Sequence, residues 1–161
     1  MMRSRVLVAC AAIVVVAACS KSSSSTTSTT TSGAITYLAS LASNKEVPPN
    51  TEVSYGSATF SLTGSILTYS VVVFNLTGNA TASHIHVGSS SVAGGVIVPF
   101  TINAVPTGTV ASGTIDLTAM PANATVSGDS LKALFNSGNA YVNVHTAAHS
   151  GGEIRGQVNK Q

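Results

Sequence analysis

The sequence predicts an all-β domain in which about eight strands form a sandwich or barrel, accompanied by one short helix. Two observations lead to this fold class. From residue 34 onward, short runs rich in Val, Ile, Thr and aromatic residues are broken at frequent intervals by Gly, Pro, Asn and Ser. Only one segment of this region shows the spacing of apolar residues that is typical of a helix.

The strands are expected where such runs lie between turn residues. They cover residues 35–42, 55–62, 66–76, 82–87, 96–101, 108–117, 140–146 and 153–159. Within residues 66–76 the successive side chains around Val72 are apolar on both faces of the expected strand. This favours a central strand that is covered on both faces. The helix is expected at residues 127–136, because Leu131 and Phe135 share a face with Leu134, and Gly138 can end the last turn.

The first residues have the pattern of a secretory signal. Arg3 and Arg5 precede an apolar run over residues 6–18 that ends in small residues, and Cys19 follows directly. The stretch Val-Ala-Ala-Cys at 16–19 resembles the lipobox of bacterial lipoproteins, in which the cysteine is lipidated and becomes the first mature residue. The similar stretch at residues 7–10 is a weaker match, since hardly any apolar segment separates it from Arg5. We therefore expect a lipoprotein signal peptide at residues 1–18.

Removal of this signal changes the charge of the chain. The full sequence has 7 Lys and Arg against 5 Asp and Glu, and two of the seven cations, Arg3 and Arg5, lie in the signal. The mature protein is then formally neutral, which argues against nucleic acid as a partner. Cys10 is lost with the signal, so that Cys19 has no cysteine left to pair with in a disulfide.

The segment behind Cys19 is expected to be a tether. Residues 21–33 consist almost entirely of Ser and Thr and have no large apolar side chain, so they cannot offset the entropy of ordering themselves. We expect residues 19–33 to link a lipid anchor to one β domain at 34–161. Ser20, in place of Asp, favours transport to an outer membrane, which places the protein in a bacterial envelope, on the periplasmic or the outer side.

The stretch from Tyr141 to Val158 concentrates polar chemistry. In a strand, Asn143 and His145 share one face with Tyr141. If the two last long strands form a hairpin, matching their apolar faces brings His145 opposite Glu153 and Asn143 opposite Arg155. Asn143, Glu153 and Arg155 would then either position a neighbouring imidazole or form a purely structural polar face, with Glu153 paired to Arg155.

His84 and His86, the two remaining histidines, lie close together in the sequence. Alternation puts His84 and His86 on one strand face, opposite Ile85. Two imidazoles at this spacing can bind one copper or zinc ion, with His145 as a third ligand and His149 as an optional fourth. Against a metal site, the His-x-His pattern is a short and weak motif, and neutral histidines on a half-exposed strand often only hydrogen-bond to the backbone. No complete set of catalytic residues can be assembled, so no residue is assigned a catalytic role.

The order of these motifs resembles that of the CHRD domain, named after chordin. The stretches that carry the resemblance are LASNKEVPP at 41–49, TASHIHVG at 81–88, AYVNVHT at 140–146 and GEIRGQ at 152–157. The resemblance implies an immunoglobulin-like β-sandwich or barrel. This family is also distantly similar to copper/zinc superoxide dismutase, but a dinuclear centre of that kind needs more histidines than the 4 in this chain. A single copper or zinc ion remains open.

Three functions are compatible with these observations. The first is a non-enzymatic binding or structural module that a lipid anchor holds on the envelope membrane. The second is a mononuclear copper- or zinc-binding protein that uses His84, His86 and His145. The third is an adhesion module that recognises a protein or a glycan, for which the sequence names no residues.

Overall fold

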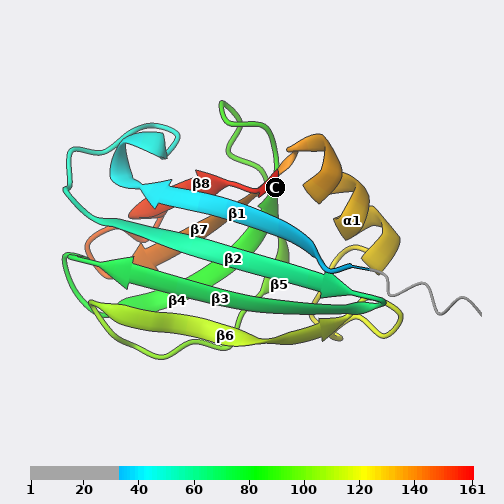
Figure 1. Ribbon diagram of the computed structural model, residues 1–161. Coiled ribbons are helices and arrows are strands. Elements are labelled where there is room, and N and C mark those ends of the chain that lie inside the picture. Colours follow the sequence, from blue (N-terminus) through cyan, green and yellow to red (C-terminus); the bar gives the residue numbers. More distant parts are fainter. Residues whose placement is uncertain (1–32) are drawn as a thin grey trace, which may run out of the picture. The chain divides into compact units, whose positions relative to one another are not determined.

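One curled antiparallel sheet organises residues 33–161, the part of the chain that the computed structural model describes (Figure 1). The elements in chain order are β1 (Ile35–Ala42), the single 3-10 turn η1 (Ser43–Lys45), β2 (Tyr55–Thr63), β3 (Ile66–Phe74), β4 (Ala80–Val87), β5 (Val96–Pro99), β6 (Gly108–Asp116), α1 (Gly128–Ser137), β7 (Ala140–Thr146), β8 (Ile154–Gln157) and β9 (Asn159–Lys160). The strands follow the order β5-β4-β7-β8-β1-β2-β3-β6, and β9 pairs with β1.

The predicted fold class is confirmed, because the described residues form an all-β domain with one short helix. A strand forms in each of the eight expected segments. The last segment, predicted as one strand, divides into β8 and β9. Its pairing with β1 is interrupted between the pairs Ala42↔Arg155 and Leu38↔Asn159.

The expectation that residues 66–76 form a central strand covered on both faces is wrong. β3 lies between β2 and the edge strand β6. Only the side chains on its inner face are buried, as at Leu67 and Val71. Ile66 and Phe74 at its ends are 40% and 38% exposed. The apolar side chains of the outer parity are partly covered by neighbours on the sheet surface: the Phe74 ring, for example, stacks on the Tyr55 ring with the centroids 5.1 Å apart.

Helix α1 covers one end of the core. Ser127 caps its first turn by accepting a hydrogen bond from the Ser130 N–H at 3.2 Å, and Gly138 ends it with a left-handed backbone at φ 67°. The buried face of the helix carries Leu131 and Phe135. The Phe135 ring makes edge-to-face contacts with Tyr37 and Phe60, at centroid distances of 5.1 and 4.9 Å.

The irregular segment 100–107 bridges the two ends of the curled sheet. Val105 accepts a hydrogen bond from the Ala80 N–H at 3.1 Å on the side of β4, and the Asn103 N–H donates to Val110 on β6 at 2.7 Å. Backbone groups that would otherwise lie open at a sheet edge are thus paired, which protects the edge from pairing with another chain.

The predicted signal peptide at residues 1–18, Cys19 and the tether up to residue 32 lie outside the described residues. From residue 33 onward, no helix combines the length and the apolar character needed to cross a membrane.

The aromatic contacts of Phe135 lead to a prediction. Changing Phe135 to Ala removes a buried ring between two other rings and should lower the free energy of unfolding by about 3 to 5 kcal/mol. Phe74→Ala, at a phenylalanine that is 38% exposed, is the matched control and should cost about 1 kcal/mol or less. Urea unfolding of both variants measures the difference, and equal losses would contradict the assignment of Phe135 to the core.

Candidate metal centre

Three histidines meet on the outer face of β4 and β7. The strands pair so that His84 lies opposite Asn143 and Ala82 lies opposite His145. His84 and His145 are therefore diagonal neighbours, while His86 follows two residues later on the same face as His84. Ile85, between them, is fully buried in the core. The three histidines each offer one ring nitrogen, and these nitrogens all lie within 4.8 Å of one another.

The spacing of these nitrogens is close to that of a metal centre. The Nδ1 atom of His84 lies 3.2 Å from the Nε2 atom of His145. A zinc ion held at about 2.0 to 2.1 Å from each ligand requires nitrogens roughly 3 to 3.5 Å apart. The pair of His84 and His145 already has this separation. The ring centroid of His86 lies 5.5 Å from that of His84, and its ligand nitrogen is within 4.8 Å of the other two, so the three rings must move closer together to share one ion.

Backbone carbonyls fix the orientation of two of the rings. The Nδ1 atom of His86 lies 3.0 Å from the Gly94 oxygen, and the Nδ1 atom of His145 lies 2.9 Å from the Ser150 oxygen. A carbonyl can only accept, so Nδ1 carries the proton in both rings and Nε2 keeps its lone pair. In residues 33–161 the Nε2 atom of His86 is buried and has no hydrogen-bond partner.

The three imidazoles are held in their neutral form. Burial, together with the charges that His145 and His86 would carry, lowers the pKa of His84 to about 4. Burial also lowers the pKa values of His86 and His145, although the hydrogen bonds to Gly94 and Ser150 act in the opposite direction. At neutral pH the three rings are therefore uncharged, the form in which histidine binds metal. The Nδ1–H group of His84 donates to the Nε2 lone pair of His145 at 3.2 Å, and Nδ1 would have to give up this proton to bind an ion.

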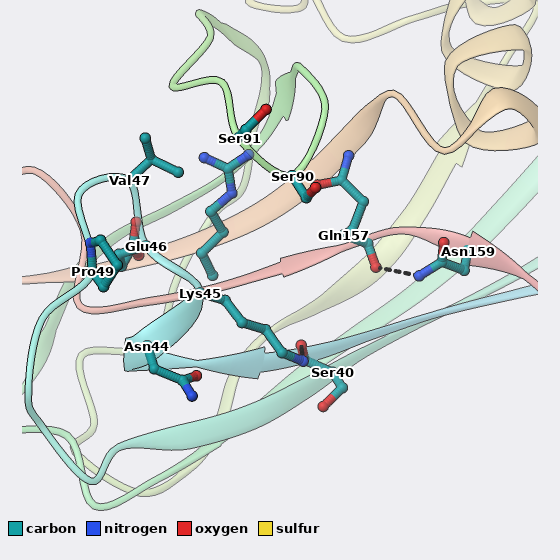
Figure 2. A pocket seen from close by; sticks show the side chains of 11 residues that line it. Ser40, Asn44, Lys45, Glu46, Val47, Pro49, Ser90, Ser91, Gln157 and Asn159 are labelled. Carbon is teal, nitrogen blue, oxygen red and sulfur yellow. Dashed lines mark hydrogen bonds between the residues drawn. The ribbon is translucent and has the colours of Figure 1, made fainter.

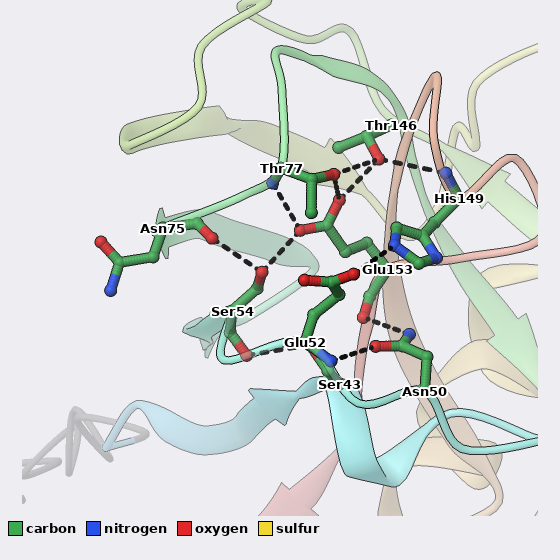
Figure 3. Close-up of polar contacts among 9 residues, drawn as sticks. All are labelled: Ser43, Asn50, Glu52, Ser54, Asn75, Thr77, Thr146, His149 and Glu153. Carbon is green, nitrogen blue, oxygen red and sulfur yellow. Dashed lines mark hydrogen bonds and ion pairs between the residues drawn. The ribbon is translucent and has the colours of Figure 1, made fainter.

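His149, the optional fourth ligand, lies apart from this cluster. His149 is on the loop that follows β7, and its Nε2 atom is 3.2 Å from a carboxylate oxygen of Glu52 (Figure 3). The three-histidine group does not include it.

The expected pair of Glu153 and Arg155 does not form. Arg155 is 2% exposed, and its Nη2 group donates instead to the backbone oxygens of Ser89 and Val92, at 2.7 and 2.9 Å. The guanidinium thereby holds the loop between β4 and β5 over the sheet.

Tyr141 connects Arg155 to the histidines. The guanidinium carbon of Arg155 lies 3.4 Å from the centroid of the Tyr141 ring, a cation–π contact. On the other side the tyrosine ring stacks on His86, with centroids 4.8 Å apart and planes inclined by 11°. The side chains of Arg155, Tyr141 and His86 thus form one continuous stack across β8, β7 and β4.

Glu153 is directed to a different set of partners (Figure 3). Its carboxylate accepts hydrogen bonds from the Ser54 hydroxyl at 2.5 Å, from the Thr77 N–H and hydroxyl at 2.8 and 2.6 Å, and from the Thr146 hydroxyl at 2.5 Å. The preceding Gly152 has φ 128°, and this turn ends the alternation that the prediction had extended through Glu153. Burial raises the pKa of Glu153, but the hydrogen bonds from Ser54, Thr146 and Thr77 outweigh it and lower the pKa overall.

Asn143 lies opposite Arg155, as the matched apolar faces predicted. Its amide nitrogen donates to both carboxylate oxygens of Glu46, at 2.8 and 3.0 Å. Burial raises the pKa of Glu46 to about 7, against the lowering effects of Arg155 and Asn143. Sequence analysis assigned Glu46 no role, because nothing local connects it with a residue 97 positions away. Its only signal was its place in the family-like stretch at 41–49.

The hydrogen bonds of Glu153 lead to a prediction about stability and pH. Glu153→Gln keeps the size of the side chain but has one acceptor oxygen in place of two, and should lower the free energy of unfolding by about 2 to 4 kcal/mol near pH 7. Because the folded-state pKa is lowered, this advantage of the wild type exists above the ordinary pKa of 4.5 and is lost as the pH falls through the folded value.

Urea unfolding of the wild type and the variant over a range of pH tests this prediction. Glu52→Gln, at the exposed partner of His149, is the control and should change stability by about 0.5 kcal/mol or less. A difference between the wild type and Glu153→Gln that is constant down to strongly acidic pH would show that the carboxylate is not the source of the stabilisation.

Comparison with known proteins agrees with the motifs and the fold. The chain shows no significant match to curated proteins or to solved structures. The family model of the CHRD domain, however, matches residues 37–158, which include the three-histidine group, Glu46, Glu153 and Arg155. This match extends over nearly all of the described fold, from β1 to the end of β8. The chain therefore belongs to the CHRD domain family.

Proposed function

We propose that this chain is a binding module of the bacterial envelope whose domain holds one copper or zinc ion through His84, His86 and His145. The buried Nε2 atom of His86, which has no partner in residues 33–161, is the observation that carries the proposal. If the histidines formed only a structural patch, this nitrogen would remain unsatisfied at a cost of about 1 to 3 kcal/mol. A metal ion shared with His84 and His145 satisfies it.

The ligand type favours certain metals. Neutral imidazole suits zinc and copper, whereas magnesium and calcium prefer oxygen ligands. Three imidazoles leave at least one coordination position for a molecule from outside the protein. The carbonyl groups of Gly94 and Ser150 orient the rings of His86 and His145, which is the role that outer hydrogen bonds have in metal centres.

Metal binding is tested with protein that is purified without a histidine tag and freed of metal by a chelator. Zn²⁺ or Cu²⁺ should bind in a ratio of one ion per chain and raise the melting temperature in a concentration-dependent manner, while Mg²⁺ should not. Changing His86 to Gln removes a ligand and should weaken binding by about a hundredfold or more. Isothermal titration calorimetry measures the stoichiometry and the affinity, and thermal unfolding measures the melting temperature.

His149→Gln is the matched control, because His149 lies on the same sheet end but outside the three-histidine group. It should bind the ion as the wild type does. Equal weakening in both histidine variants, or no binding by the wild type, would leave the three histidines as a hydrogen-bonded polar patch. The unfolding of each metal-free variant shows whether the change has disturbed the fold.

The anchoring of the module is the second part of the proposal. The apolar run that ends at Cys19, the lipobox-like stretch at 16–19 and the Ser/Thr-rich tether support a lipidated cysteine at the start of the mature chain. Several acyl chains on one cysteine bind a membrane stably, whereas a single chain binds reversibly. Ser20 favours the outer membrane. The tether then holds the domain away from the lipid surface, where ions or larger partners can reach it.

Changing Cys19 to Ala tests the anchor. Expressed in a bacterium with two membranes, the wild type should fractionate with the outer membrane. The variant should accumulate as soluble or unprocessed protein, because no lipid can be attached. Immunoblots of fractions separated by density provide the measurement, with Cys10→Ala as the control that should behave as the wild type. A processed Cys19→Ala protein that stays with the membrane would contradict lipid anchoring.

A further inference from the structure

A pocket of about 560 Å³ is lined by Arg155, which the stack through Tyr141 connects to His86. Figure 2 shows Glu46, Val47 and Pro49 on one wall, Ser90 and Ser91 on the loop that follows β4, and Gln157 on β8. Its volume lies within the range of roughly 300 to 1,000 Å³ that is typical of small-molecule sites.

The pocket is lined by a buried cation, Arg155, whose charge a nearby carboxylate, Glu46, balances only in part. Arg155 is 2% exposed, and no carboxylate in residues 33–161 forms an ion pair with it. Buried charges in proteins are nearly always paired. Both hydrogen bonds found for the guanidinium come from Nη2, which leaves Nη1 and Nε as free donors.

The closest acidic group supplies this balance only in part. Glu46 lines the same pocket, but its pKa is raised to about 7, so that much of its population is neutral near physiological pH. Lys45, an exposed cation at the rim, adds a second positive charge, and its Nζ atom is held by the Ser40 carbonyl at 2.7 Å. The electrostatic field in the pocket therefore favours an anion.

The other lining groups indicate which kind of anion fits. Ser90, Ser91 and Ser40 contribute hydroxyl groups, Asn44 and Gln157 contribute amides, and Val47 and Pro49 add apolar surface. Guanidinium groups match the two oxygens of a carboxylate geometrically, while hydroxyl and amide side chains pair with the hydroxyl groups of sugars.

We propose that this pocket binds an acidic sugar of the uronic-acid class, with the carboxylate on Arg155, the charge of Lys45 adding attraction from the rim, and the sugar hydroxyl groups on the serines and amides of the rim. The site is separate from the three histidines and requires no metal. Sequence analysis considered recognition of a glycan but could assign no residues to it. The pocket supplies such residues.

The pocket is tested by two-dimensional NMR of the full chain in the presence of a chelator, at about pH 6, where Glu46 with its pKa of about 7 is mostly protonated. Glucuronate and galacturonate should shift the backbone signals of Lys45, Ser90 and Ser91 with dissociation constants in the millimolar range. Glucose, which has no carboxylate, should leave them unchanged. Inorganic phosphate should bind more weakly than either uronate.

Three variants locate the binding. Lys45→Gln, at an exposed side chain, should weaken uronate binding by roughly threefold or more, whereas Lys132→Gln, on the exposed side of α1, should not change it. Arg155→Lys keeps the charge but loses the planar donor pair, and should weaken binding by roughly tenfold or more. Unperturbed signals elsewhere in the spectrum show that each variant is folded.

Three results would overturn the proposal: no signal shift at the pocket with either uronate, equal shifts with glucose, or binding of inorganic phosphate at least as tight as that of the uronates. The last result would mean that the pocket takes anions without selecting a sugar. Because the chelator removes metal throughout, none of these results depends on whether the histidines bind an ion.

Discussion

A buried carboxylate determines how the loops meet at one end of the sheet. Glu153 has no exposed surface, and a buried charge without hydrogen-bond donors costs several kcal/mol. Its donors come from the β1–β2 connection at Ser54, from the β3–β4 connection at Thr77 and from the end of β7 at Thr146. The same interactions fix the start of the loop from which the Ser150 carbonyl reaches His145. The orientation of His145 therefore depends on a network to which it does not itself belong.

The outer face of β4, β7 and β8 is covered by loops instead of solvent, and this covering produces the chemistry of the site. The loop after β4 contacts His86 through Gly94 and Arg155 through Ser89, while the segment after β1 places Glu46 on Asn143. An antiparallel sheet commonly leaves its polar face in water. Here the face is desolvated, so that its histidines are neutral and its arginine is buried without an ion pair to any carboxylate of the described residues.

Much of this arrangement could be predicted because it follows from the two-residue period of strands. The alternation of side chains predicted that His84, His86 and His145 leave the core together, and matching apolar faces predicted that Asn143 lies opposite Arg155. The partners of Glu153 could not be predicted, since they depend on the backbone of Gly152 at φ 128°, a single turn that no period describes. Likewise, the contact between Glu46 and Asn143 joins residues 97 positions apart, and only the closed fold brings them together.

The stack of Arg155, Tyr141 and His86 places the two proposed sites in electrostatic contact. The charge of Arg155 lies against one face of the tyrosine ring, and His86 stacks on the other face. Burial is the main cause of the lowered pKa of His86, and the charge of Arg155 lowers this pKa further. The same charge opposes a metal cation at His86. If both proposed sites are occupied, an anion bound to Arg155 would offset this repulsion and favour the cation. Because binding free energies are reciprocal, a metal ion on the histidines would then strengthen anion binding by the same factor. Covering the polar face would thus couple the two proposed sites without any movement of the sheet.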